Sequence, residues 1–170
     1  ANASKIEQEA SNQLKEHLLL LSSQAPKIVN EADYVGKNGI FIGSTKYAND
    51  TNKLEDGFAF KNIGDDFFIQ GGSEKGLLFG VYSLLESFGF RKYAADDPLD
   101  IPTTINLKLP NDIIKVPKIN YRTTNYYEGR DSEYADWNKL SSSDSWGLFV
   151  HTFEVLVPPE KYGKSNPEYY

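Results

Sequence analysis

The sequence predicts an α/β (α+β) fold, in which one sheet carries two helices on one face and the first strands of a truncated TIM barrel follow. Three observations lead to this prediction: two stretches with apolar residues at helical spacing, several short Phe- and Ile-rich runs between turn residues, and a change of character after Pro117. Strands mixed with amphipathic helices favour a sheet covered by helices. Two strands separated by a helix are how a parallel barrel begins.

The first helix is predicted over residues 4–23. Ser4 and Glu7 have the spacing of a capping box, and Pro26 marks the end. We expect His17 on the surface, because it lies off the apolar stripe. The stripe consists of Ile6, Ala10, Leu14, Leu18 and Leu21.

Short strands are predicted at residues 27–30 and 39–43. A hairpin is predicted from the runs 57–62 and 66–70, which are joined by the turn sequence Ile63-Gly64-Asp65.

The second helix is predicted over residues 74–88. Gly76 and Gly80 lie four residues apart on it, a spacing that lets a helix pack closely on a sheet. Gly89 is a suitable residue just past its end.

Residues 90–93 and 103–109 are predicted as further strands. Two prolines, Pro110 and Pro117, then mark a boundary, which suggests a first domain over residues 1–112 and a second over 113–170.

The second domain is predicted to contain strands at residues 119–125 and 147–153 with a short helix at 131–140 between them. The tail, residues 158–170, is extended or helical. Two strands cannot close a barrel, so the barrel is predicted to be incomplete.

The composition excludes several classes of function. The formal net charge is −6 and there are no cysteines, which argues against nucleic acid as a partner and excludes thiol chemistry. No apolar run is long enough to span a membrane. Two histidines without carboxylates at ligand spacing predict no metal site, and no cofactor motif is present. The aromatic share of 14% suits sugar rings or interfaces, although aromatic residues also simply fill cores.

Residues 71–97, GGSEKGLLFGVYSLLESFGFRKYAADD, resemble the small N-terminal domain that precedes the catalytic barrel in β-N-acetylhexosaminidases and α-glucuronidases. In those enzymes a glycine-bearing helix follows a strand and packs on the sheet. Residues 117–140 (PKINYRTTNYYEGRDSEYADWNKL) and 145–170 (SWGLFVHTFEVLVPPEKYGKSNPEYY) resemble an uncharacterised bacterial family of glycoside-hydrolase-like proteins. The chain departs from the family at Trp137, which is followed directly by Asn138, and it lacks the strand that usually precedes the first helix.

The resemblance implies a glycoside hydrolase or sugar-binding protein that is secreted, periplasmic or on the cell surface, with a signal peptide removed before Ala1. The carbohydrate partner would bind through the intact barrel. The 24 acids show no isolated pair with apolar neighbours, so we expect no catalytic residue in this chain and place the acid/base residues after Tyr170.

Arg122 is the first candidate substrate-binding residue, together with Tyr121. The Tyr-Arg pair resembles the position of the sugar-clasping arginine of hexosaminidases, and a guanidinium can bind two hydroxyls of one pyranose. The alternative is an ion pair with a nearby acid such as Glu128 or Asp131.

His151 and Trp146 are the other candidates. His151 lies in a predicted buried strand, where its alternative is a structural histidine with a hydrogen-bond partner. Trp146 and Trp137 could stack on sugars, although core or interface packing is the commoner use of tryptophan.

Three hypotheses follow. The first is the non-catalytic N-terminal part of a glycoside hydrolase that acts on a polysaccharide or glycan. The second is a stand-alone carbohydrate-binding or protein-interaction module, with Tyr126-Tyr127 and Tyr169-Tyr170 as its contact points. The third is a structural domain that braces a barrel. We also expect the unpaired strand at residues 147–153 either to pair with another molecule, which gives self-association, or to lie over the first domain.

Overall fold

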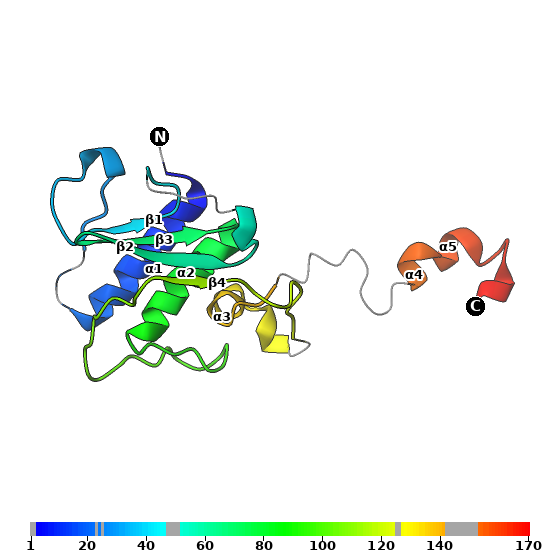
Figure 1. Ribbon diagram of the computed structural model, residues 1–170. Coiled ribbons are helices and arrows are strands. Elements are labelled where there is room, and N and C mark those ends of the chain that lie inside the picture. The colour runs from blue at the N-terminus through cyan, green and yellow to red at the C-terminus, as the bar shows by residue number, and fades with distance from the viewer. Residues whose placement is uncertain (1–2, 23, 25, 47–51, 125–126, 142–152) are drawn as a thin grey trace.

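A computed structural model describes residues 3–22, 24, 26–46, 52–124, 127–141 and 153–170 of the chain. Its sheet, its two long helices and the short helices that follow are shown in Figure 1. The helices and strands are α1 (Lys5–Leu21), β1 (Ile40–Ile42), β2 (Phe58–Ile63), β3 (Asp66–Gly71), α2 (Glu74–Ser87), β4 (Ile113–Lys115), α3 (Ser132–Trp137), α4 (Phe153–Leu156) and α5 (Pro159–Tyr162). Short 3-10 turns lie at Glu31–Asp33, Asn52–Leu54, Tyr127–Arg130 and Pro167–Tyr169.

The four strands form one mixed sheet in the order β1-β3-β2-β4. β2 and β3 are antiparallel, from Phe58 opposite Gly71 to Ile63 opposite Asp66, so the predicted hairpin is confirmed. Its turn contains Gly64 at a φ of 62°, a left-handed conformation that favours glycine. β1 is parallel to β3, which confirms the strand predicted at residues 39–43.

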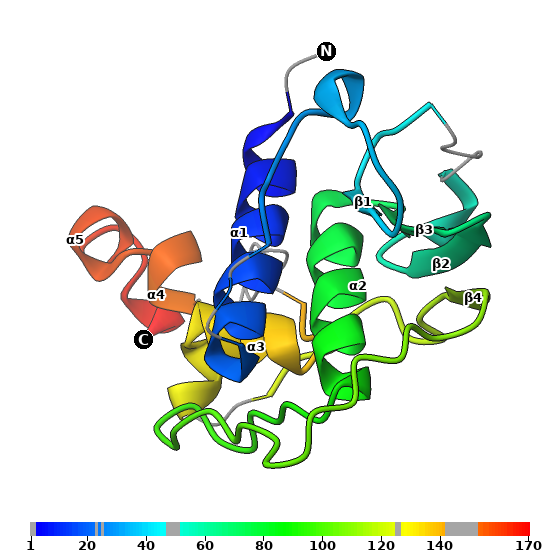
Figure 2. The same cartoon turned by 90° about the vertical axis from the view of Figure 1, so that its left-hand side faces the viewer.

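Both long helices lie on the same face of the sheet (Figure 2). α2 contacts β2 and β3, and α1 contacts α2 and β1. The predicted α+β class, one sheet with two helices on one face, is therefore confirmed in outline. No helix in the part of the chain that the structure describes has the length and apolar character needed to cross a membrane.

Glycines bring α2 into direct contact with the sheet. A Cβ atom at Gly76 would lie 2.3 Å from the carbonyl oxygen of Gly57, and one at Gly80 would lie 2.8 Å from a methyl carbon of Ile69. Neither position can hold a larger side chain unless the helix moves away. Gly89 follows α2 with a φ of 107°, as predicted for the residue past the helix end.

The predicted capping box at the start of α1 is confirmed. The Ser4 hydroxyl accepts a hydrogen bond from the Glu7 N–H at 3.3 Å, and the Glu7 carboxylate accepts one from the Ser4 N–H at 2.7 Å. The same carboxylate accepts a hydrogen bond from the Ser44 N–H at 2.6 Å, which ties α1 to the segment after β1. Burial on its own would raise the pKa of Glu7, but these hydrogen bonds outweigh it and hold the pKa below its ordinary value of 4.5.

We expect Glu7→Gln to make the free energy of unfolding less dependent on pH in acidic solution. A carboxyl whose pKa is depressed by folding stabilises the protein above its unfolded pKa, and this contribution disappears as the pH falls through its folded pKa. The difference in unfolding free energy between the wild type and Glu7→Gln should therefore shrink below pH 4.5. Urea unfolding at a series of pH values measures it, with the exposed Glu16→Gln on the same helix as the control. A difference that stays constant with pH would contradict the expectation.

Several predicted strands are wrong. Residues 27–30 and 103–109 form no strand, and residues 90–93 contribute only one bridge, between Arg91 and Asp100. Ile105 and Leu107 remain 55% and 46% exposed, so the alternating pattern does not bury a face. The edge of β2 is instead paired with β4, which lies within the predicted boundary.

Asp112 explains why β4, and not residues 103–109, pairs with β2. Its carboxylate accepts hydrogen bonds from the backbone N–H and the side-chain amide of Asn62, at 2.8 and 2.9 Å, and so fixes the chain beside β2.

The strand predicted at residues 119–125 is also wrong over its described part, 119–124. The chain bends there, and the Arg122 side chain turns back to the Ile119 carbonyl three residues earlier.

The strand predicted at residues 147–153 lies outside the described residues, except for Phe153, which begins α4. The self-association expected through it stays a prediction. The helix predicted at residues 131–140 is confirmed as α3, with Asp131 as its N-cap, and the tail contains α5.

The prediction that His17 lies on the surface is wrong. The side chain is only 6% exposed, and its ring packs against Tyr82, Phe90 and Trp137 with centroid distances of 6.5, 5.5 and 5.6 Å. His17 lies three residues after Leu14 and seven after Ala10, so it belongs to the buried stripe. Its Nδ1 is satisfied at 2.7 Å by the Gln13 carbonyl oxygen, which removes the usual cost of burying a polar group.

Trp137 of α3 completes this aromatic cluster and is 1% exposed. It is therefore a core residue, the commoner of its two predicted uses. β4 and α3 both follow residue 112, yet they pack on β2 and α2 respectively. The proposed boundary between the two domains stays a prediction, and the two segments share one hydrophobic core.

Candidate functional site

Two adjoining cavities lie beside β2, α2 and the segment that follows β4. The first has a volume of about 320 Å³ and is lined mainly by polar residues: Glu55, Asp56, Gly72, Ser73, Pro117, Asn120 and Arg122. The second has a volume of about 550 Å³ and extends between β2, β4 and α2. Asp56, Pro117 and Arg122 line both cavities and so mark their junction. Both volumes lie in the range of small-molecule sites.

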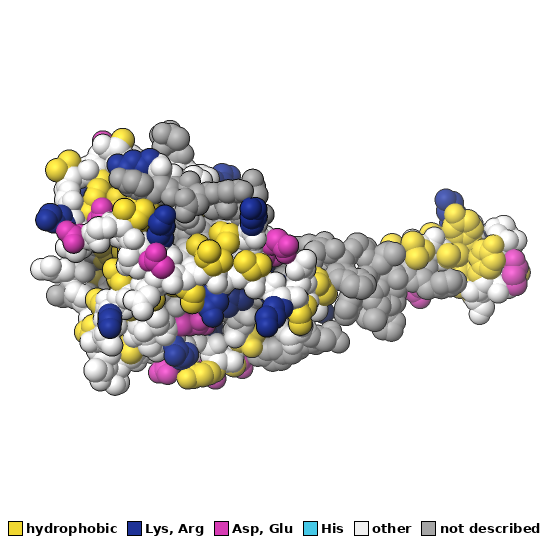
Figure 3. Space-filling view, in the orientation of Figure 1, with side chains coloured by type: hydrophobic (Ala, Val, Ile, Leu, Met, Phe, Trp, Pro, Cys, Tyr) yellow, Lys and Arg dark blue, Asp and Glu magenta, His cyan; other side chains and the backbone are white. Residues whose placement is uncertain are grey.

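The second cavity has mostly apolar walls. These are Phe58 and Phe60 of β2, Phe79 of α2, Ile113 of β4, and Val116, Pro110 and Pro117 around β4. Near β4, the face of the molecule in Figure 3 shows hydrophobic side chains beside basic and acidic ones. The polar residues of this cavity are Asp56, Ser83, Glu86, Ser87, Lys115, Arg122 and Lys139.

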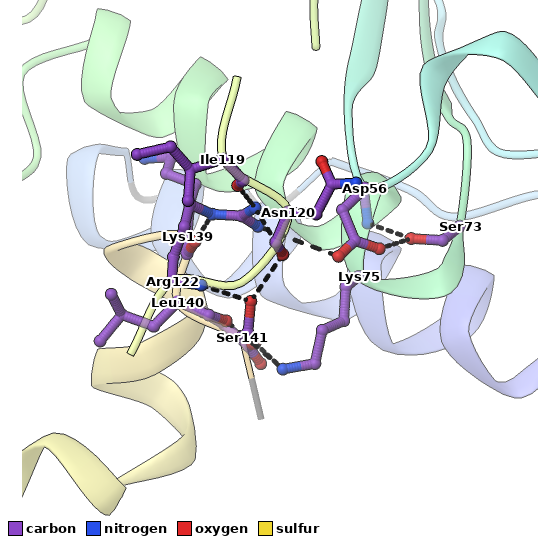
Figure 4. A network of polar contacts seen from close by, with 11 residues as sticks. Asp56, Ser73, Lys75, Ile119, Asn120, Arg122, Lys139, Leu140 and Ser141 are labelled. Atoms are coloured by element: carbon purple, nitrogen blue, oxygen red, sulfur yellow. Dashed lines mark hydrogen bonds and ion pairs between the residues drawn. The ribbon is translucent and has the colours of Figure 1, made fainter. Parts of the chain in front are cut away.

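Arg122 is held by the carbonyl groups of its own neighbourhood (Figure 4). Its Nε donates to the carbonyl of Lys139 at 2.7 Å. Its Nη1 donates to the carbonyls of Ile119 at 2.6 Å and Asn120 at 3.2 Å. Its carbon Cζ lies 5.7 Å from the ring centroid of Phe79. Most of the donor capacity of the guanidinium is therefore used to fix the chain.

The remaining nitrogen of Arg122, Nη2, is buried and has no hydrogen-bond partner. It lies 3.9 Å from Oδ2 of Asp56, an ion-pair distance that is too long for a hydrogen bond. This acid is neither Glu128 nor Asp131, the two partners expected from sequence proximity.

Asp56 is oriented by the start of α2. Its Oδ1 accepts a hydrogen bond from the Ser73 hydroxyl at 2.7 Å. The Ser73 oxygen in turn accepts from the Gly76 N–H at 3.0 Å and caps the helix. The helix start thus fixes the carboxylate that faces Arg122.

Residues 139–141, which follow α3, form a second side of the site. Ser141 donates its N–H to the Arg122 carbonyl at 2.6 Å, and its hydroxyl accepts from the Arg122 N–H at 3.0 Å. Lys139 binds Glu86 of α2 at 2.6 Å. Burial lowers the pKa of Lys139, and the Glu86 carboxylate opposes that shift.

This arrangement can bind polar groups, and three acidic residues line it, Glu55, Asp56 and Glu86. Asp56 and Glu86 already have partners, in Ser73 and Lys139. No group of three or more histidine, cysteine, aspartate or glutamate side chains is placed to hold a metal ion within the described residues.

Of the two predicted binding residues that the structure describes, one lies at this site. Arg122 lines both cavities, whereas Tyr121 is not among the lining residues of either. Trp146 and His151 lie outside the described residues, so their roles stay predictions. The sequence analysis missed Asp56 and Ser73. The only local signal was their position, one just before a strand and the other just before a helix.

Comparison with known proteins gives one family. No curated protein and no solved structure matches this chain. Residues 93–170 match a family described as a domain of unknown function, DUF4838. The matched region includes Arg122 and the segment 139–141 of the site, and it begins after α2. The second part of the chain is therefore similar to this family, whose description assigns no activity.

Proposed function

We propose that this chain is the non-catalytic N-terminal part of a glycoside hydrolase that acts on a polysaccharide or glycan. The observation that carries the proposal is the packing of α2. It follows β3 directly and contacts the sheet through Gly76 and Gly80, where a Cβ atom would meet backbone and core atoms at 2.3 and 2.8 Å. This is the arrangement implied by the resemblance of residues 71–97 to the N-terminal domains of hexosaminidases and α-glucuronidases.

The chemistry of the site supports a non-catalytic role. Glycosidic bond cleavage generally needs a proton donor and a second carboxylate placed around one bond. Asp56 is engaged by Ser73 and faces Arg122, and Glu86 is paired with Lys139. Arg122 itself uses two of its three nitrogens to fix backbone carbonyls. We infer that the site joins and positions segments for a catalytic barrel placed after Tyr170.

The test compares the 170-residue chain with the complete natural polypeptide. We expect the natural product to have a much larger intact mass and to hydrolyse members of a panel of nitrophenyl glycosides and polysaccharides. The 170-residue chain alone should show no hydrolysis above buffer. A natural product no longer than this chain, or hydrolysis by the chain alone, would contradict the proposal.

A stand-alone carbohydrate-binding module is the second candidate, and the polar cavity favours it. The carboxylate of Asp56, the amide of Asn120 and the hydroxyl of Ser73 line it together with Arg122. These groups bind sugar hydroxyls. Titration of the chain with monosaccharides, followed by amide chemical shifts, tests this candidate. Shifts confined to residues of the polar cavity are expected, and their absence for all sugars would contradict it.

A further inference from the structure

The junction of the two cavities has one unsatisfied polar group. Arg122 Nη2 is buried without a hydrogen-bond partner, which is unfavourable for a donor. Asp56 Oδ2, 3.9 Å away, is too distant to accept from it. Nη2 has almost no accessible surface, so the Asp56 carboxylate, whose side chain is 35% exposed, is the member of the pair that a ligand hydroxyl can reach, and it can accept a hydrogen bond from that hydroxyl.

The space on one side of this junction is polar and the space on the other is apolar. The polar cavity of about 320 Å³ adds Glu55, Ser73 and Asn120 to the shared residues. The cavity of about 550 Å³ is walled by the rings of Phe58, Phe60 and Phe79 and by Ile113. A single molecule seated at Arg122 and Asp56 would therefore have a hydroxyl-binding space beside it and an apolar space behind it.

We propose that the two cavities together bind an amphipathic ligand with a hydroxyl-bearing head and an apolar body. Alkyl and aryl glycosides are one class with this chemistry. One hydroxyl donates to Asp56 beside Arg122, the other hydroxyls contact the polar cavity, and the alkyl or aryl group enters the space between β2, β4 and α2. The proposal rests on the carbohydrate-binding candidate and is independent of whether a hydrolase barrel follows.

The charged residues that line the two cavities favour a ligand with an uncharged head and an apolar body. Over the two cavities together, the three acids Glu55, Asp56 and Glu86 are matched in number by the three bases Lys115, Arg122 and Lys139. Glu86 and Lys139 are bound to each other at 2.6 Å. Burial of each methylene of an alkyl chain strengthens binding by roughly fourfold, so the apolar body is expected to strengthen binding well beyond that of the head alone.

The experiment uses n-octyl β-D-glucoside below its micelle concentration, with glucose and 1-octanol as the two half-ligands. Amide chemical shifts and calorimetry give the dissociation constants. We expect the octyl glucoside to bind at least about tenfold more tightly than either half-ligand, since both parts contribute. Contacts from the octyl protons to the Ile113 methyl groups, measured by intermolecular NOE, place the tail without any variant.

Ser83 provides a matched pair of variants. It lines the apolar cavity from α2, so Ser83→Leu fills the space and Ser83→Ala only removes the hydroxyl. We expect Ser83→Leu to weaken octyl glucoside binding by about tenfold or more and to leave glucose binding unchanged. Ser83→Ala leaves the space open, so the octyl group should still strengthen binding over the head alone. Asp56→Asn should reduce octyl glucoside binding to the level of octanol.

The outcomes separate the amphipathic-ligand proposal from the carbohydrate-binding candidate on which it rests. If octanol binds as tightly as octyl glucoside, or if the tail shows no contact with Ile113, the combined site is wrong. If glucose binds and the octyl group adds nothing, carbohydrate binding stands and the amphipathic ligand is wrong. If none of the three probes binds, both the ligand class and the carbohydrate-binding candidate fail.

Discussion

Trp137→Ala is expected to lower the free energy of unfolding by about 3–5 kcal/mol, the range for removing a large buried aromatic side chain. Trp137 is 1% exposed, and its ring centroid lies 4.8 Å from that of Tyr82 and 5.6 Å from that of His17. The substitution leaves a cavity between α1, α2 and α3, because the three helices contribute these three rings. The expected cost is large since Trp137 is the only fully buried residue of α3.

Urea unfolding followed by circular dichroism measures the change. Trp137→Phe is the informative companion, because the indole N–H is buried without a hydrogen-bond partner and its removal costs nothing. We expect Trp137→Phe to lose less than half of what Trp137→Ala loses. Ile114→Ala, at a position that is 70% exposed, is the surface control. If Trp137→Ala costs no more than Ile114→Ala, α3 is not part of the core.

Local pattern was sufficient for the elements formed by nearby residues. The capping box of α1, the turn at Gly64 and the start of α2 after Ser73 all depend on contacts within a few positions in the sequence, and these elements were predicted. β4 depends instead on Asp112 binding Asn62, fifty residues earlier. The alternating run at 103–109 has the better strand pattern, but nothing in the sequence shows which run will reach the edge of β2.

His17 shows a second limit of pattern. An apolar stripe is identified by apolar residues, so a histidine within it is read as a gap. The ring is nevertheless buried, because one nitrogen binds the Gln13 carbonyl and three aromatic rings surround it. The aromatic partners come from α2, from Phe90 and from α3, so no local window contains the information.

The candidate site was predicted in part. Arg122 was selected by its resemblance to a sugar-binding arginine, and it lines both cavities. Its counterion, Asp56, lies 66 positions earlier and could not be paired with it from sequence. The carbonyl groups that hold it belong to residues 119, 120 and 139, and backbone partners leave no trace in residue type.

Arg122→Ala is expected to lower the free energy of unfolding by about 2–3 kcal/mol, the scale of losing charge-assisted hydrogen bonds from a partly buried group. The guanidinium connects the bend at residues 119–122 with residue 139, and its side chain is 19% exposed. Without it, the carbonyl oxygens of Lys139 and Ile119 lose their donors. The segments before and after α3 should then separate more easily.

Two companion variants distinguish the hydrogen bonds from the ion pair. Arg122→Lys keeps the charge but cannot donate to two separate carbonyls in the planar geometry of a guanidinium, so we expect it to recover less than half of the loss. Asp56→Asn removes only a pair at 3.9 Å in which the acid is 35% exposed, and exposed pairs contribute about 1 kcal/mol or less. Urea unfolding should give the order Arg122→Ala, Arg122→Lys, Asp56→Asn from the most to the least destabilised variant. If Asp56→Asn is as destabilising as Arg122→Ala, then the ion pair, rather than the carbonyl contacts, holds Arg122 at the junction of the two cavities.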